Sequence, residues 1–144
     1  MIPQAAARRV ERPRGGRYRR RRMLSHVSVG VTDLARAVAF YDAALGALGY
    51  VRVFSGPISA GWGTPDGTEP FAVKLQARPP SAGPGSHLAF AAPSPAAVDR
   101  FHAEALRHGA VDDGGPGERP EFGPTYYAAF VFDPDGNRLE AVHQ

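Results

Sequence analysis

The chain has 144 residues, of which 43% are hydrophobic, so it can form one ordinary globular core and has little room for a second independent domain. It has no cysteine, which excludes disulfide bridges, zinc-thiolate clusters and cysteine nucleophiles. The formal net charge is +3, and no apolar run approaches the roughly 20 residues that span a bilayer, so we expect a cytoplasmic protein without a membrane partner.

The positive charge is concentrated in residues 1–22, which hold nine arginines and a single acidic residue, Glu11. This leader has almost no apolar periodicity, so we expect it to be disordered and a single folded domain to span residues 23–144. An arginine run of this kind could bind nucleic acid or another anionic surface. The competing reading is that Met23 is the real start and that residues 1–22 are upstream sequence translated in error. We favour the second reading and do not expect nucleic acid as the main partner.

The first predicted elements after the leader are a strand at 26–31 and a helix that begins at Thr32-Asp33 and ends at Gly49. The strand alternates His26, Ser28 and Gly30 with three valines. Strands are then predicted at 50–54, 58–63 and 71–75.

The same order then repeats at an offset of 61 residues, with His87 at the position of His26. A second strand-like run, HLAFAA, is followed by a helix that begins at Ser94-Pro95 and ends near Gly109, with an inward stripe predicted to include Val98, Phe101 and Leu106. Strands are predicted at 110–112, 126–132 and 138–143. In both copies a Pro-Asp-Gly turn joins the last two strands.

Each copy is therefore a βαβββ module, module one at about 24–78 and module two at about 86–143. We expect an α+β fold in which the two modules form curled mixed sheets around a central cleft, with one helix per module outside. The bulky strand faces would pack against the helices, and the small or polar positions would line the cleft: His26, Ser28, His87, Ala89 and Glu140. Such a surface is a plausible small-molecule cavity.

Three segments together resemble the vicinal oxygen chelate superfamily, also called the glyoxalase, bleomycin resistance and extradiol dioxygenase superfamily. They are HVSVGVTDLARAVAFYDAALGALGY at 26–50, HLAF at 87–90 and YYAAFVFDPDGNRLEAV at 126–142. The resemblance implies a metal cleft between the paired modules, with ligands from the first and fourth strands of each module. Carried over by position, the metal ligands are His26, His87 and Glu140. Two imidazoles and a carboxylate suit iron, manganese, nickel or zinc with open positions for substrate.

Alternatives remain for these three residues, which could instead form a metal-free polar cavity or have no present role. The fourth ligand position also departs from the family, because it carries Lys74, and a protonated ammonium is no metal ligand. Lys74 could pair with Glu140 or bind an anionic substrate beside a three-ligand metal. A register slip of one residue would turn it outward. Glyoxalase I proper, with two histidines and two acids, is therefore disfavoured.

Further candidates surround this set. The glycine- and proline-rich loop 112–125 carries Arg119, which could bind a substrate carboxylate by two parallel hydrogen bonds. Tyr126 or Tyr127 could supply a phenol, and we assign Tyr127 with Glu140 to catalysis. Trp62 is a possible cavity wall, grouped with Lys74 and Arg119 as substrate-binding. Plain packing or solvation is the alternative for each.

The sequence therefore favours a metal-dependent enzyme that holds two neighbouring oxygens of a small-molecule substrate, as a lyase, isomerase or ring-cleaving dioxygenase. The alternative is a metal-free protein that binds a drug or metabolite, as the bleomycin resistance branch implies. The resemblance also implies a homodimer whose cleft is completed across the interface.

Overall fold

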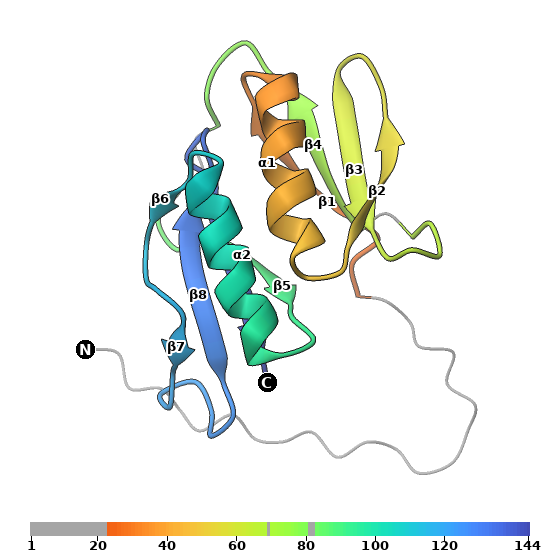
Figure 1. The fold of residues 1–144 in the computed structure, drawn as a ribbon. Coiled ribbons are helices and arrows are strands. Elements are labelled where there is room, and N and C mark those ends of the chain that lie inside the picture. The colour runs from red at the N-terminus through yellow and green to blue at the C-terminus, as the bar shows by residue number, and fades with distance from the viewer. Residues whose placement is uncertain (1–22, 69, 81–82) are drawn as a thin grey trace.

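A computed structural model of the protein describes residues 23–68, 70–80 and 83–144 (Figure 1). The arginine-rich leader predicted at 1–22 lies outside the described residues. Module one consists of β1 (Val27–Val31), α1 (Leu34–Gly46), β2 (Val51–Ser55), β3 (Ser59–Gly63) and β4 (Phe71–Leu75). Its four strands form one sheet in the order β1-β4-β3-β2, with β1 parallel to β4.

Module two repeats this plan with β5 (Leu88–Ala91), α2 (Pro95–Arg107), β6 (Val111–Asp112), β7 (Gly117–Glu118), β8 (Tyr127–Phe132) and β9 (Arg138–His143). Its main path runs β5-β9-β8-β6, and the short strand β7 pairs with β8. The predicted α+β fold with two βαβββ modules is confirmed. The addition is β7, which lies inside the segment predicted as a loop.

The helices begin where short polar side chains cap them. The Asp33 carboxylate accepts a hydrogen bond from the Arg36 amide at 3.0 Å, and the Ser94 hydroxyl accepts one from the Ala97 amide at 3.2 Å. Each cap satisfies an amide that would otherwise lack a partner at the helix start. The chain leaves α1 through Gly49, whose φ of 88° suits glycine.

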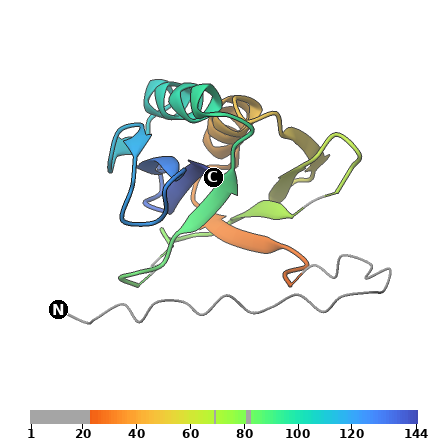
Figure 2. The same cartoon turned by 90° about the horizontal axis from the view of Figure 1, so that it is seen from below.

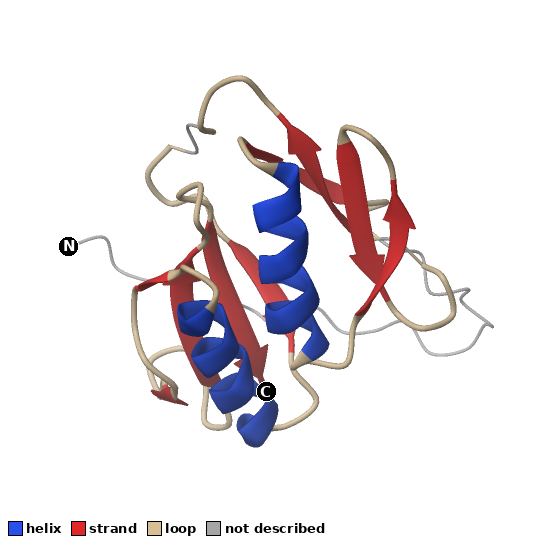
Figure 3. Ribbon diagram, turned by 45° about the horizontal axis from the view of Figure 1, so that its top comes forward, coloured by secondary structure: helices blue, strands red, loops and turns tan. Residues whose placement is uncertain are grey.

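The two helices contact each other and lie on one side of the molecule, with β1 and β5 on the other side (Figure 2). Figure 3 shows the strands of the two modules as separate sheets around this helix pair. One shared core fills the space between helices and sheets, and the edge-to-face pair of Phe71 and Phe90, 5.1 Å between ring centroids, joins the modules within it. Leu106 was predicted to face this core, but it is 40% exposed. It stands next to buried Ala105 at the end of α2 and points to solvent.

β1 and β5 are both edge strands, and within the described residues no strand pairing joins the two sheets. The sheets therefore do not close into a barrel. Alternation fixes which side chains face away from the helices. In module one these include Ser28 and Lys74, and in module two Ala89, Phe130 and Glu140.

Polar contacts tie the last turn of module two to module one. The Asp133 carboxylate, 2% exposed, accepts a hydrogen bond from the Tyr41 hydroxyl at 2.5 Å. Asp135 accepts hydrogen bonds from the Thr32 amide and hydroxyl at 2.9 and 2.6 Å, and Asn137 donates to the Gly30 carbonyl at 3.0 Å. The Pro-Asp-Gly turn thus fixes one module against the other.

Among the described residues, no helix is both long enough and apolar enough to cross a membrane.

Candidate functional site

Glu140 is a buried carboxylate in the middle of β9. The register of the sheet pairs it with Ala89 on one side and Phe130 on the other, so its side chain points away from the helices. It is only 2% exposed, and both of its oxygens have partners. Nε2 of His87 lies 3.0 Å from Oε2, and the Tyr126 hydroxyl donates to Oε1. Burying a carboxylate costs free energy unless hydrogen bonds replace its water, and these two groups supply them.

Tyr126 is a phenol that stays protonated over the ordinary pH range. Burial, together with the hydrogen bond to Glu140 and the charge of that residue, raises the pKa of Tyr126 to about 12. Its ring also packs against Phe122, with 5.3 Å between centroids. A phenol held in this state is a hydrogen-bond donor.

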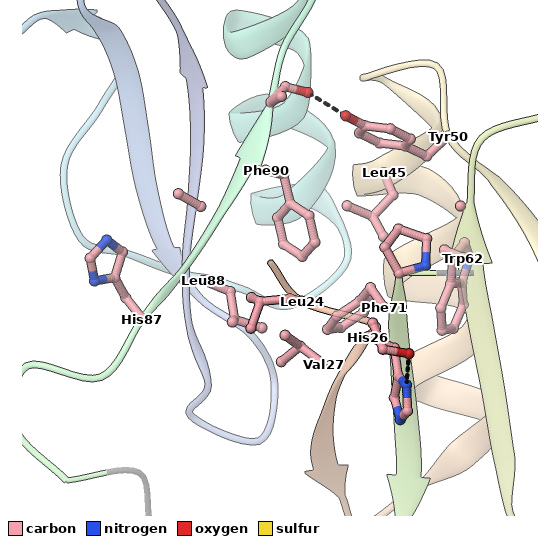
Figure 4. A pocket seen from close by; sticks show the side chains of 15 residues that line it. Leu24, His26, Val27, Leu45, Tyr50, Trp62, Phe71, His87, Leu88 and Phe90 are labelled. Carbon is pink, nitrogen blue, oxygen red and sulfur yellow. Dashed lines mark hydrogen bonds between the residues drawn. The ribbon is translucent and has the colours of Figure 1, made fainter. Parts of the chain in front are cut away.

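His87 belongs to the Glu140 cluster, which we define as His87, Tyr126 and Glu140, and it also lines a cavity between the modules. It directly precedes β5, and its side chain is 37% exposed. The cavity has a volume of about 420 Å³, within the range of about 300–1,000 Å³ typical of ligand pockets. Figure 4 shows Leu45, Trp62, Phe71 and Phe90 around it. Among the described residues, its walls carry no carboxylate, lysine or arginine, and this lining suits an apolar, neutral molecule.

His26 also lines this cavity, but it lies on the far side from His87 (Figure 4). His26 is exposed, and its Nδ1 lies 3.1 Å from the Ser25 hydroxyl. No three histidine, aspartate or glutamate side chains of the described residues are grouped so that they could hold one metal ion. A single chain thus brings His87 and Glu140 together and leaves His26 apart, so it does not by itself fit the three-ligand ion.

Lys74 lies on the face of its sheet that points away from the helices, in register with Gly30 and Ser59. It is exposed. Within the part of the chain that the structure describes, Lys74 forms no ion pair with Glu140 or with any other residue. Its charge is available to an external anion.

The other sequence candidates occupy different places. The Tyr127 hydroxyl donates to Asp99 on α2 at 2.7 Å, and this hydrogen bond is the main reason that its pKa is raised. Tyr127 therefore points to the helix side, away from Glu140. Trp62 is 1% exposed and donates from its indole to Asp42 at 2.9 Å while forming part of the cavity wall. Arg119 lies on the side of Glu140, over the ring of Phe130.

Sequence reasoning assigned the catalytic phenol to Tyr127, whereas the hydroxyl that reaches Glu140 belongs to Tyr126. A signal for this was present. Counting back across the Pro-Asp-Gly turn pairs Tyr127 with His143, which lies on the face opposite Glu140. Arg138, whose guanidinium carbon lies 5.2 Å from the centroid of the Phe130 ring, was not singled out at all.

Comparison of the chain with known proteins finds a matching family model and similar solved structures. The family model of the Glyoxalase/Bleomycin resistance protein/Dioxygenase superfamily matches residues 23–141. Among solved structures, a glyoxalase/bleomycin resistance protein from Albidiferax ferrireducens T118 is 36% identical, with a TM-score of 0.75, over 85% of this chain and 99% of that chain.

Two further structures share the fold at lower identity. A glyoxalase-related enzyme from Fulvimarina pelagi is 20% identical, with a TM-score of 0.64, over 84% of this chain and 87% of that chain. A glyoxalase/bleomycin resistance protein/dioxygenase family enzyme from Burkholderia phytofirmans PsJN is 22% identical, with a TM-score of 0.61, over 82% and 95%. A comparison with curated proteins gives no match.

Proposed function

Because the chain belongs to the glyoxalase/bleomycin resistance protein/dioxygenase superfamily, we propose that it is an enzyme that acts on a small molecule at the Glu140 site. The observation that carries the proposal is the burial of Glu140 together with the side chains that contact it. This carboxylate is 2% exposed and contacts an imidazole and a phenol, with no lysine or arginine paired to it among the described residues. A buried carboxylate in contact with an imidazole and a phenol brings together residue types that transfer protons in catalysis.

The three side chains can divide acid–base work between them. An ionised Glu140 can accept a proton from a carbon next to a carbonyl group, and the Tyr126 hydroxyl can donate a hydrogen bond to the oxygen on which negative charge develops. Without a bound metal, His87 can donate a hydrogen bond from Nε2 to Glu140, 3.0 Å away, and so orient the carboxylate. This division suits a lyase or isomerase that acts on a substrate with neighbouring oxygens. The same site with a redox-active metal would suit a ring-cleaving dioxygenase.

We further propose that a divalent ion, iron, manganese, nickel or zinc, is held by His87 and Glu140 of one copy of the chain and His26 of a second copy. An imidazole nitrogen and a carboxylate oxygen already lie side by side in one chain, and both are ligand types that these metals accept. When bound, such an ion would act as a Lewis acid on two neighbouring substrate oxygens. The second copy is required because His26 lies apart from the other two residues within a chain.

The exposed sheet faces support a homodimer with this arrangement. The face of module one that points away from its helix carries Ser28, Lys74, which has no ion pair among the described residues, and exposed Phe54 on β2. The corresponding face of module two carries Glu140, with exposed Phe122 packed against Tyr126 beside it. A dimer in which module one of each copy covers module two of the other would bury both faces and complete two equivalent sites.

The alternative is a metal-free protein that binds a neutral drug or metabolite. The cavity between the modules favours it, because its walls are mostly aromatic and aliphatic and its volume of about 420 Å³ suits a small organic molecule. Trp62 would then be a wall of the binding site. In this reading the Glu140 cluster would be structural.

Elemental analysis of the purified chain after loading with each metal separates the two functions. The enzyme proposal predicts close to one ion per chain in the unmodified protein and a large loss in His87→Ala, Glu140→Gln and His26→Ala. His108→Ala is the matched control, because His108 lies at the end of α2 and contacts Glu104. It should keep the full metal content.

Two results together would favour the binding protein. The unmodified protein would hold no metal after loading, and it would bind a neutral aromatic ligand that Trp62→Ala no longer binds. Metal that survives all three substitutions would overturn the proposed ligand set. Sedimentation analysis of the same samples tests the dimer.

A further inference from the structure

Arg119 is a fixed guanidinium without a carboxylate partner. It precedes the last strands of module two, and its NH2 and NH1 groups donate to the carbonyls of Gly115 at 2.8 Å and Glu118 at 3.3 Å. Its amide donates to the Tyr126 carbonyl at 2.8 Å. Within the described residues it forms no ion pair. Backbone dipoles orient this charge but do not neutralise it.

The loop around Arg119 is shaped to fit the guanidinium. A Cβ added at Gly117 would lie 3.0 Å from NH1, and one added at Gly114 would lie 3.5 Å from NH2. Gly114 also has a φ of 136°, which a side chain disfavours. The backbone at these two positions therefore packs directly against the arginine.

A second guanidinium shares the same aromatic ring. The Cζ atoms of Arg119 and Arg138 lie 5.8 and 5.2 Å from the centroid of the Phe130 ring, within the range of a cation–π interaction. Asp113 holds Arg138 through Nε at 2.6 Å and leaves both of its terminal nitrogens without a partner in the described chain. Phe130 is the β8 residue directly opposite Glu140. Two guanidiniums thus lie over the ring of the residue that pairs with Glu140, on the face of the sheet to which Glu140 points.

We propose that the Glu140 site takes an anionic substrate, whose carboxylate or phosphate group is held by Arg119 with Arg138 beside it. This inference rests on the proposed function and adds the substrate class to it. A planar guanidinium binds two oxygens of an oxyanion at once, and an orienting set of carbonyls means that little side-chain freedom is lost on binding. Because Glu140 would repel the anion, the charged group is placed at the arginines and the reacting carbon and oxygen at Glu140 and Tyr126.

Binding of malonate and of inorganic phosphate to the full-length chain tests the proposal by calorimetry, with uncharged malonamide as the comparison. We expect Arg119→Gln to weaken binding of the preferred anion at least about tenfold, because the uncharged amide cannot form two charge-assisted hydrogen bonds to the anion. Arg119→Lys, which keeps the charge without the paired donors, should give an intermediate loss. Arg100→Gln on α2 removes the same charge from an exposed position and should bind as the unmodified chain does. Both variants retain the arginines of residues 1–22, so a difference between them comes from position 119.

Malonate preferred over phosphate identifies a carboxylate substrate, and the reverse identifies a phosphate. The proposal is overturned if Arg119→Gln binds as tightly as Arg100→Gln in samples with unchanged melting temperature, if malonamide binds as well as malonate, or if the unmodified chain binds neither anion. Failure of the two proposals can be told apart. Anion binding through Arg119 with metal content insensitive to His87→Ala retains this inference and rejects the metal site, and the opposite result rejects only the anion.

Discussion

The Tyr126 hydroxyl donates a hydrogen bond to the Glu140 carboxylate, and each group depends on the other as its partner. The carboxylate is buried, so every donor lost to it leaves a charge that water cannot reach. Tyr127, one residue along the chain, makes a similar hydrogen bond to Asp99 at the exposed surface of α2. The two neighbouring phenols therefore have different energetic weights.

Tyr126→Phe should lower the free energy of unfolding by about 1–3 kcal/mol, because it removes one of the two donors of a buried carboxylate. Tyr127→Phe should cost under about 1 kcal/mol, because water can replace its hydroxyl at Asp99. Urea unfolding of both variants measures the difference. Repeating Tyr126→Phe in the Glu140→Gln protein should reduce its cost, and an undiminished cost there would show that the phenol acts through other contacts.

For single residues, the sequence predicted the face of the sheet correctly in some positions and not in others. The alternation of β9 correctly predicts that Glu140 faces away from the helices. Alternation within β8 alone did not distinguish Tyr126 from Tyr127, because their faces follow only from the pairing of β8 with β9 across the Pro-Asp-Gly turn. Arg138 was overlooked because only the folded loop brings Asp113 to it.

Among the elements, the hairpin that follows β3 depends on a glycine for reasons of space. A Cβ at Gly63 would lie 1.3 Å from the carbonyl oxygen of Thr68 and 2.9 Å from Pro70. Gly46, at the end of α1, has no atom within 4 Å of the same position. The pair makes a matched test of close packing in one element and open space in another.

Gly63→Ala should destabilise the protein by about 3 kcal/mol or more, because backbone must move to admit the methyl group. Gly46→Ala should be neutral or stabilising by up to about 1 kcal/mol, because alanine favours the helix and meets nothing. Thermal unfolding of both variants measures this. Equal melting temperatures for the two variants would mean that the β3–β4 connection is looser than the structure shows.

The elements themselves were largely predictable from local physics. Capping by Asp33 and Ser94 and the stop at Gly49 are local signals, and both helices begin where those residues predict. β7 was missed because its two residues are held only by pairing with β8, so its composition is that of a loop. Leu106 was misplaced because it follows Ala105 by one residue, which turns it away from the buried face that Val98, Phe101 and Ala105 form on α2.

At the scale of the whole molecule, the turn of module two fixes the relation between the modules. Asp133 is buried and accepts hydrogen bonds from Tyr41 of module one and from Asn137 of its own turn. Tyr41→Phe should therefore lower the free energy of unfolding by about 1–3 kcal/mol at neutral pH. Tyr50→Phe, which removes a half-buried hydrogen bond to the Ala91 carbonyl, is the control and should cost less. Denaturant midpoints compare the two.

The cost of Tyr41→Phe should also shrink in alkali. Burial, and then the negative charge of Asp133, raise the pKa of Tyr41 well above its ordinary value of 10.0. Above that pH the unfolded chain releases this proton while the folded chain keeps it, so the stability of the unmodified protein falls as the pH rises. Phenylalanine cannot ionise, so the gap between the two proteins should narrow progressively as the pH rises above about 10. A gap that stays constant would show that the pKa of Tyr41 is the same in the folded and the unfolded chain.

The position of His26 relative to His87 and Glu140 could not be predicted from alternation. A periodic pattern assigns side chains to one face of a sheet, but the angle between the two sheets is set by how α1 and α2 pack on the shared core. In one chain that packing leaves His26 across the cavity from His87 (Figure 4). The proposed metal site therefore depends on a contact between copies.

Metal content of mixed dimers tests this account most directly. His26→Ala and His87→Ala chains should each lack the ion, but mixed after dissociation and reassociation they should regain about one ion per four chains, because each mixed dimer has one site with all three ligands. Recovery to that level, measured by elemental analysis against each variant alone, is the predicted result. No recovery in a mixture shown to exchange subunits would contradict a site shared between copies.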